Sequence, residues 1–447
     1  MTQNKNIIVL GAAESGVGAA VLAKVQGYNV FVSDIGSIKE EYKKELIENE
    51  ILFEENNHTV EKILSAGEVI KSPGVPDNAS IIRKIKAEEI PIISEIEFAG
   101  RFTDAKMICI TGTNGKTTTT LLTHFILKNA GLNVGLAGNV GHSLAMQVAK
   151  KNHDYYVIEL SSFQLDYMFE FRANIAVLLN ITPDHLDRYD YKIENYINSK
   201  FRITQNQTSE DAFIYCADDE ILNKEITNKT IQAQSYPFSI EKEEGMTAYL
   251  NSNQLTINTQ TKPLTMTIYD LALQGKHNLY NSMAAGISSK ILDIKNEEIR
   301  QSFSDFKNIE HRLELVNTIH GVEFINDSKA TNVNSTWFAL ESVTKPIVWI
   351  AGGVDKGNDY ALLQDLVRDK VKAIVCLGKE NEKLHDAFGH VVSEIVDSGS
   401  ASDAVYQAFS LSDKGDTVLL SPACASFDLF KNYEDRGWQF KQAVRAL

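Results

Sequence analysis

Short apolar runs rich in β-branched residues alternate with helical patterns along almost the whole chain. Eight such runs stand out, at residues 6–11, 28–34, 107–112, 155–160, 175–180, 346–353, 372–378 and 417–422. Continuous apolar strands of this length, separated by helices, are typical of parallel sheets that are covered on both faces. The sequence therefore predicts an α/β protein.

Three glycine-rich turns, each after the first strand of a group, indicate three domains: GAAESG (11–16), GTNGKT (112–117) and AGGVDKG (351–357). We place the domains at residues 1–96, 97–308 and 309–447, a number that suits a chain of 447 residues. The first and third are expected to be Rossmann-like, and the central one to resemble a P-loop ATPase. Alternating polar and apolar residues over about 203–270 predict an antiparallel elaboration of the central domain.

Composition limits the class of partner. The formal net charge is −15, from 44 basic and 59 acidic residues, which opposes sequence-independent binding to nucleic acid or to an anionic membrane. The four cysteines are far apart, as expected for reduced thiols, and neither a signal-peptide core nor a membrane-length apolar run is present. We expect a cytoplasmic monomer.

The segment MICITGTNGKTTTTLL has the strand, loop and helix order of a phosphate-binding loop. Glycines let several backbone N–H groups converge on one anion, and the helix N-terminus adds its positive dipole end. Lys116 would reach the β- and γ-phosphates, and the Thr117 hydroxyl would bind Mg²⁺. Only two residues separate Gly112 from Gly115, where the general pattern has four, so a glycine turn with a threonine helix cap is the alternative.

Two further polar residues follow predicted strands, Glu159 after YYVIEL and His185 after IAVLLNITPD. Carboxyl ends of strands form the ligand crevice of open α/β sheets. A carboxylate there can hold the Mg²⁺ that bridges phosphates, whereas a lone histidine is more often structural because magnesium prefers oxygen. On its own, Lys200 reads as a helix lysine that extends its amino group to water.

These stretches are similar to the Mur ligase family, which joins an amino acid to a carboxylate at the expense of ATP. The resemblance runs through GTNGKT, ELSSFQL (159–165), HLDRY (185–189), GKHNLYN (275–281), HR (311–312), NDSKATN (326–332) and SPACASFDLFKNYEDRG (421–437). It is strongest for members that add D-glutamate. It implies ATP-dependent addition of D-glutamate to UDP-N-acetylmuramoyl-L-alanine through an acyl phosphate, in peptidoglycan precursor synthesis.

The resemblance also implies residue roles. Catalytic residues would be Lys116, Glu159, His185 and Lys200. Two Mg²⁺ ions would be held by Thr117, Glu159, His185 and Lys200, the last as a carbamate formed with CO₂. ATP would be bound by Gly112, Thr113, Asn114, Gly115, Lys116, Thr117, Thr118, Asn278, Asn281, Arg312 and Asp327. The UDP-sugar would contact Ser15, Asp34, Ser72, Gly74 and Asn139, and D-glutamate would contact Lys329, Thr331, Lys356 and Ser426.

Two residues depart from the family pattern, and other functions stay open as alternatives. Glu14 would stand beside the diphosphate of the sugar nucleotide, and Asp355 directly precedes Lys356 without an intervening glycine. The alternatives are a sibling Mur ligase or a folylpolyglutamate synthetase, a P-loop nucleotide switch without ligase chemistry, and a dehydrogenase suggested by GAAESG. The dinucleotide fingerprint is incomplete because Ala13 replaces its second glycine.

Overall fold

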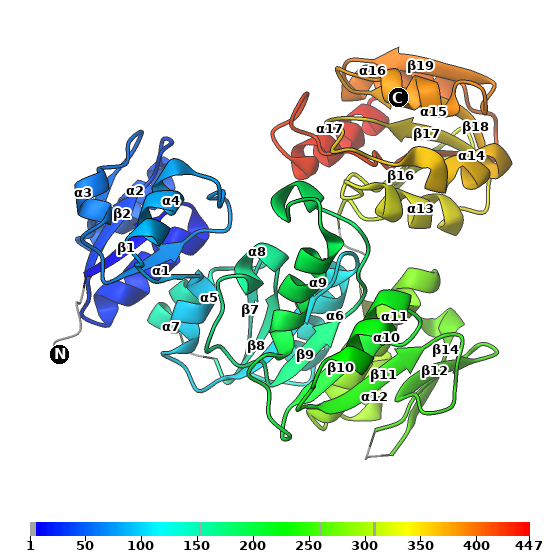
Figure 1. Cartoon of the computed structure of the whole chain (residues 1–447). Coiled ribbons are helices and arrows are strands. Elements are labelled where there is room, and N and C mark those ends of the chain that lie inside the picture. Colours follow the sequence, from blue (N-terminus) through cyan, green and yellow to red (C-terminus); the bar gives the residue numbers. More distant parts are fainter. Residues whose placement is uncertain (1–5, 152, 260–261, 307–309) are drawn as a thin grey trace. The chain divides into compact units, whose positions relative to one another are not determined.

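A computed structural model describes residues 6–151, 153–259, 262–306 and 310–447 (Figure 1). It forms two compact units, the first comprising Met1–Gln274 and Asn278–Phe306 and the second Gly275–His277 and Lys307–Leu447. Each unit is described by itself. In the described residues no helix is long and apolar enough to cross a membrane.

The N-terminal part of the first unit is a five-stranded parallel sheet in the order β3-β2-β1-β4-β5. Its strands are β1 Asn6–Leu10, β2 Asn29–Ser33, β3 Leu52–Glu54, β4 Glu68–Lys71 and β5 Ile92–Ile93. Its helices are α1 Glu14–Val25, α2 Glu40–Glu48, α3 Val60–Ile63, α4 Ser80–Ala87 and α5 Glu95–Gly100. Isoleucines of α4 pack on Ile8 and Val69 of the sheet.

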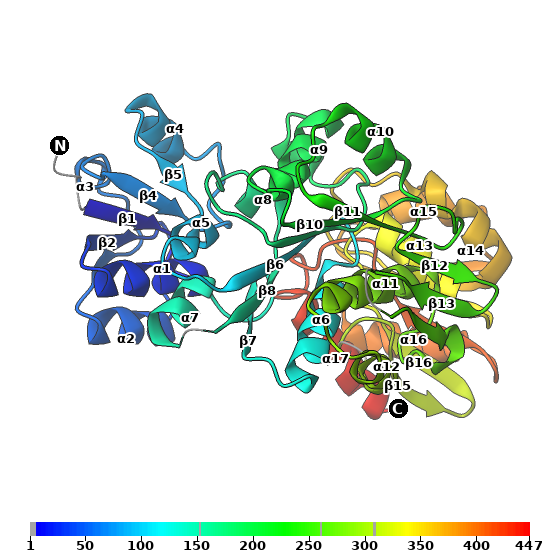
Figure 2. The ribbon, with the colours of Figure 1, turned by 90° about the horizontal axis from the view of Figure 1, so that it is seen from below.

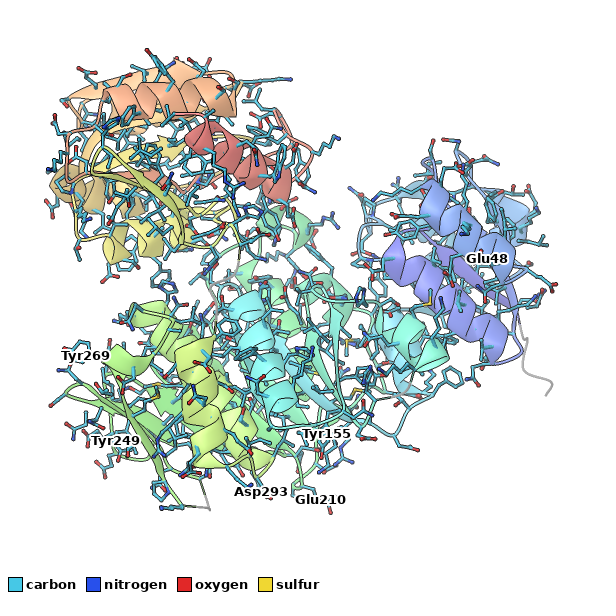
Figure 3. All side chains as sticks on the ribbon, turned by 180° about the vertical axis from the view of Figure 1, so that it is seen from behind. Glu48, Tyr155, Glu210, Tyr249, Tyr269 and Asp293 are labelled. Atoms are coloured by element: carbon cyan, nitrogen blue, oxygen red, sulfur yellow. The ribbon has the colours of Figure 1, made fainter. Side chains whose placement is uncertain are left out.

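The rest of the first unit is built on a nine-stranded sheet in the order β14-β13-β12-β11-β10-β9-β6-β8-β7. The strands are β6 Lys106–Thr111, β7 Val134–Gly138, β8 Tyr155–Glu159, β9 Ile175–Leu178, β10 Ala212–Cys216, β11 Gln234–Ser239, β12 Ala248–Asn251, β13 Gln254–Ile257 and β14 Leu264–Thr267. Figure 3 shows Tyr155, the first residue of β8, and Glu210, just before β10, near the same edge of this sheet. That edge holds the amino ends of the parallel strands, so the carboxyl ends lie opposite.

One expectation for this sheet is confirmed only for part of its length. We predicted that residues 203–270 form an antiparallel elaboration, but β10 and β11 extend the parallel sheet beside β9. Only β12, β13 and β14 pair antiparallel with one another. Sequence alternation marks a half-exposed strand but does not give the direction of its neighbour, which is why the prediction failed for β10 and β11.

Helices cover both faces of the central sheet. They are α6 Lys116–Asn129, α7 Leu144–Lys150, α8 Ser162–Leu165, α9 Ile193–Phe201, α10 Glu220–Asn228, α11 Lys276–Ile291 and α12 Asn296–Asp305, with 3₁₀ turns at Leu186–Arg188, Arg202–Thr204 and Ile268–Asp270. Helix α6 lies against α12 and against β7 and β8. Helix α7 packs along α1, as Figures 1 and 2 both show.

The second unit is a six-stranded sheet in the order β15-β16-β20-β17-β18-β19, parallel except for β15. Its strands are β15 Glu314–Ile319, β16 Val322–Asn326, β17 Ile347–Ala351, β18 Val371–Leu377, β19 Glu394–Ser398 and β20 Thr417–Leu420. Its helices are α13 Val333–Ser342, α14 Gln364–Lys370, α15 Glu382–Phe388, α16 Ala401–Ser410 and α17 Tyr433–Arg445, with a 3₁₀ turn at Tyr360–Leu363. Two apolar clusters fill its two faces.

The α/β class and all eight predicted strands are confirmed. Three sheets match the number of predicted domains. The boundaries at 96 and 308 stay predictions, and the second lies at residues outside the described ranges.

Glu95, in the first turn of α5, ties the N-terminal part to helix α7. Its Oε1 accepts hydrogen bonds from the Ser143 hydroxyl at 2.7 Å and from the Ala145 N–H at 2.6 Å, and its side chain is buried. Burial raises the pKa of this carboxyl from 4.5 to about 7, although these hydrogen bonds act in the opposite direction. Folding therefore favours the protonated acid.

We expect the pH dependence of stability to report this group. Between about pH 4.5 and 7 an unfolded chain would carry an ionised Glu95 while the folded chain keeps its proton, so wild type should lose stability relative to Glu95→Gln as the pH rises. The loss should approach about 3 kcal/mol, from about 1.4 kcal/mol for each pKa unit. Denaturant unfolding across this range measures it. The exposed Glu48 (Figure 3) supplies the control Glu48→Gln, which should follow wild type. A constant difference between wild type and Glu95→Gln would contradict the assignment.

Candidate functional site

The phosphate loop follows β6, an interior strand that lies between β8 and β9. Gly112 has φ 150° and Gly115 has φ 83°, conformations that L side chains rarely adopt. A Cβ on Gly115 would lie 2.4 Å from Oδ1 of Asn281. The two glycines thus allow a tight turn directly before the N-terminus of α6, as a phosphate loop requires.

Asn180 holds the loop in shape. Its side-chain Oδ1 accepts from the Asn114 N–H at 2.8 Å, and its Nδ2 donates to the Asn114 carbonyl at 3.0 Å. Its backbone carbonyl accepts from the Thr113 N–H at 3.0 Å. Sequence reasoning missed Asn180, although its place two residues after β9 was a usable signal.

Lys116 folds back over its own loop. Its Nζ donates to the carbonyl oxygens of Gly112 at 2.8 Å and Thr113 at 2.7 Å. This arrangement places the ammonium group at the start of α6, where the loop N–H groups and the helix dipole also favour an anion. Thr118 is buried and Thr117 is partly exposed in the same first turn.

The two asparagines of GKHNLYN lie on one face of α11, as predicted. Asn281 donates to Oδ1 of Asn278 at 3.2 Å and accepts from the Thr119 hydroxyl at 3.2 Å. Both asparagines are buried. Asn281 therefore lies against the phosphate loop and α6, and its assignment to the adenine side of ATP stays a prediction.

Glu159, the last residue of β8, is 1% exposed. Its Oε1 accepts from Nδ2 of Asn139 at 2.8 Å, while its Oε2 has no hydrogen-bond partner among the described residues. A buried carboxylate oxygen without a donor is costly unless a cation or water completes it. Thr117 follows β6, the strand beside β8, so its hydroxyl and the Glu159 carboxylate form an oxygen donor set that suits Mg²⁺.

Lys200 differs from the expectation of a solvent-reaching lysine, because its side chain is almost wholly buried, with 1% exposed. Its Nζ donates to the Gly112 carbonyl at 2.8 Å and lies 4.7 Å from the ring centre of Tyr196. Burial, and then the charge of Lys116, lower the pKa of Lys200 well below its ordinary value. The structure thus places a readily deprotonated amine beside the phosphate loop.

His185 lies after β9 in a left-handed conformation, with φ 53°. Its Nε2 is 3.7 Å from Oδ2 of Asp184, and its ring makes an edge contact with Phe163 at 5.3 Å between centroids. Asp184 was not among the predicted site residues, but its charge acts on Lys200. A second carboxylate therefore lies in this region, which the motif TPDHLD could have suggested.

In the N-terminal sheet, the predicted sugar-nucleotide residues gather at the carboxyl ends of β1, β2 and β4. Asp34 accepts from the N–H groups of Ala12 at 2.7 Å and Gly36 at 2.8 Å, and the Ser72 hydroxyl donates to the Gly11 carbonyl at 3.2 Å. Ser15 is in the first turn of α1, and Gly74 is exposed. This edge is where ligands bind in such sheets.

Glu14 does not stay within the glycine turn. Its Oε1 lies 3.2 Å from Nδ1 of His142 and 3.3 Å from the Ser143 N–H, both in the loop that follows β7. The departure from the family pattern is therefore a contact between α1 and this loop.

In the second unit, Arg312 precedes β15, and the other predicted residues follow β16, β17 and β20. Asp327 is buried; its oxygens accept from the Leu313 N–H at 3.3 Å and the Ser421 hydroxyl at 2.9 Å, and burial raises its pKa to about 6 while Arg312 opposes that rise. Nζ of Lys329 donates to the Tyr433 hydroxyl at 3.1 Å. Thr331 is partly exposed, Lys356 is exposed and Ser426 is buried.

Asp355 is a turn-forming residue. It accepts from the Gly357 N–H at 2.7 Å and from Nζ of Lys383 at 2.7 Å. Burial disfavours its charge, yet these donors lower its pKa below the usual value. The Asp355 carboxylate therefore holds the turn that carries Lys356 and pairs with Lys383.

Comparison with known proteins agrees with this arrangement. Residues 7–81 match the MurD N-terminal domain, 110–288 the Mur ligase middle domain and 311–424 the Mur ligase glutamate ligase domain. The chain belongs to the Mur ligase family, a class of ATP-dependent ligases.

Particular relatives are named UDP-N-acetylmuramoylalanine--D-glutamate ligase. Those of Bacteroides fragilis and Bacteroides thetaiotaomicron are 60% identical over 446 residues, which cover 99% of this chain and 100% of each relative. That of Porphyromonas gingivalis is 56% identical over 444 residues, 99% of both chains. The fold is shared with MurF from Acinetobacter baumannii (TM-score 0.64, 17% identity, 98% of this chain and 93% of that one) and with UDP-N-acetylmuramate-alanine ligase MurC from Thermotoga maritima (TM-score 0.63, 17% identity, 99% of both).

The Gly115 geometry leads to a test. Gly115→Ala places an alanine in a left-handed backbone conformation, and its Cβ displaces Asn281 from the hydrogen bonds to Thr119 and Asn278. We therefore expect the variant to bind nucleotide more weakly and to lose about 2–4 kcal/mol of stability. Gly131→Ala is the matched control, because φ is also positive, at 82°, and nothing lies within 4 Å of its Cβ. The control should lose only about 1 kcal/mol. Unfolding curves and ADP calorimetry measure both effects; equal behaviour of the two variants would contradict the role of Gly115.

Proposed function

We propose that this chain ligates D-glutamate to UDP-N-acetylmuramoyl-L-alanine at the expense of ATP, in peptidoglycan precursor synthesis. The observation that carries the proposal is the phosphate loop, with Lys116, Glu159 and Lys200 gathered around one strand end. The names of relatives 60% identical over the full chain support the choice of substrates.

The reaction needs activation because a carboxylate is a poor electrophile. An oxygen of the alanyl carboxylate attacks the γ-phosphorus of ATP while the bond to ADP breaks, giving an acyl phosphate. The D-glutamate amine then attacks the acyl carbon, loses a proton, and phosphate leaves as the amide forms. The chain contributes mainly alignment and charge neutralisation.

The side chains divide this work. Lys116 and the loop N–H groups bind the β- and γ-phosphates, and Asn139 orients the Glu159 carboxylate. Thr117, Glu159, His185 and a carbamate on Lys200 would hold Mg²⁺, which when bound neutralises phosphate charge. Arg312 and Asp327 are assigned to ATP, and Lys329, Thr331, Lys356 and Ser426 to the carboxylates of D-glutamate, where cations and hydroxyls suit a dianion. Ser15, Asp34, Ser72 and Gly74 are assigned to the UDP-sugar.

We propose that the enzyme acts as a cytoplasmic monomer.

An omission assay tests the function. Phosphate release from ATP and Mg²⁺ should require both UDP-N-acetylmuramoyl-L-alanine and D-glutamate, and L-glutamate should not substitute. Lys116→Ala should reduce turnover by at least about a thousandfold, because the γ-phosphate loses its principal cation. Release that is unaffected by omission of D-glutamate would indicate a nucleotide switch instead of a ligase.

The carbamate on Lys200 has a direct test. Only a neutral amine attacks CO₂, and burial lowers the pKa of Lys200 in the required direction. In ¹³C-bicarbonate the protein should show a carbamate resonance that Lys200→Met removes. Lys290→Met is the control, because Lys290 is also buried on a helix with a lowered pKa but bonds to Asn296. A resonance that survives Lys200→Met would overturn the assignment.

A further inference from the structure

Arg436, in the first turn of α17, is a buried cation that the proposed mechanism leaves unused. Its side chain is 1% exposed. Nε donates to the Ser328 hydroxyl at 3.0 Å, and Nη2 donates to the carbonyls of Ser328 at 2.9 Å and Cys424 at 3.1 Å. Nη1 donates to the Gly352 carbonyl at 3.3 Å.

These acceptors belong to three strand-end loops, at residues 327–332 after β16, 352–359 after β17 and 421–432 after β20. The loops carry Lys329 and Thr331, Lys356, and Ser426 respectively. One planar guanidinium group thus fixes the mutual positions of the loops assigned to D-glutamate. A fork of rigid donors is suited to this, whereas lysine offers a single point of attachment.

The charge of Arg436 is not neutralised by a contacting acid. Among the described residues no carboxylate forms an ion pair with it, and Asp327 and Asp428 act only through space. Burial lowers the pKa of Arg436 to about 10, so it remains a cation at neutral pH. A positive charge in the first turn of a helix is also opposed by the helix dipole.

A buried charge held only by neutral acceptors is expensive, and an apolar side chain would avoid that cost. We propose that Arg436 is a positioning residue for the incoming amino acid: it locks the three strand-end loops together and supplies a positive potential that favours a dianionic amino acid. This inference rests on the proposed function and deepens it by naming a determinant of amino-acid binding.

Steady-state kinetics of the full chain test the inference. We expect Arg436→Lys, which keeps the charge but loses the fork, to raise KM for D-glutamate about tenfold, and Arg436→Met to raise it about a hundredfold. KM for ATP should change less than about threefold in both variants. The control is Arg445→Met, which removes an exposed arginine from the same helix and should behave as wild type.

The outcomes separate the two proposals. If wild type shows no D-glutamate-dependent phosphate release, the proposed function fails. If wild type is active but a folded Arg436→Met keeps its KM for D-glutamate, or if KM for ATP rises by the same factor, the positioning role is overturned. Should Arg436→Met not fold, Arg436→Lys decides alone, and an unchanged KM for D-glutamate in that variant overturns the inference.

Discussion

The carbonyl oxygen of Gly112 accepts hydrogen bonds from Nζ of two lysines, Lys116 and Lys200, each at 2.8 Å. Two side-chain amino groups therefore converge on one backbone atom at the end of β6, and that of Lys200 is buried. Burial, and then repulsion by the charge of Lys116, lower the pKa of Lys200. The loop N–H groups and Lys116 favour an anion here, whereas the carboxylates of Glu159 and Asp184 suit a bound cation.

This arrangement resolves an apparent conflict with composition. A chain with net charge −15 is proposed to act on three anionic substrates. Positive potential need not come from net charge, because loop N–H groups, a helix N-terminus and a few lysines supply it locally. In the second unit Arg436 is another local source of positive potential, and its guanidinium group is held by carbonyl oxygens instead of a carboxylate.

Acidic side chains also serve the architecture beyond the phosphate loop. Glu95 joins α5 to the start of α7, and Glu14 reaches the adjoining His142 and Ser143. Asn139, in the same loop, bonds to Glu159. One short segment after β7 therefore contacts both the N-terminal turn and the carboxylate proposed to bind magnesium, which links the sugar-nucleotide residues to the ATP residues within the first unit.

The sequence alone determined the eight most apolar strands, the α/β class and the phosphate loop, because buried parallel strands are continuously apolar and a glycine turn before a helix has few other uses. It also determined the family, since the matching motifs span the chain in order. Only the tertiary structure decided the direction of β10 and β11, the burial of Lys200, the contacts of Glu14 and the clamp of Arg436 on three loops. These depend on which segments meet in the folded chain, for which local periodicity and spacing carry no signal.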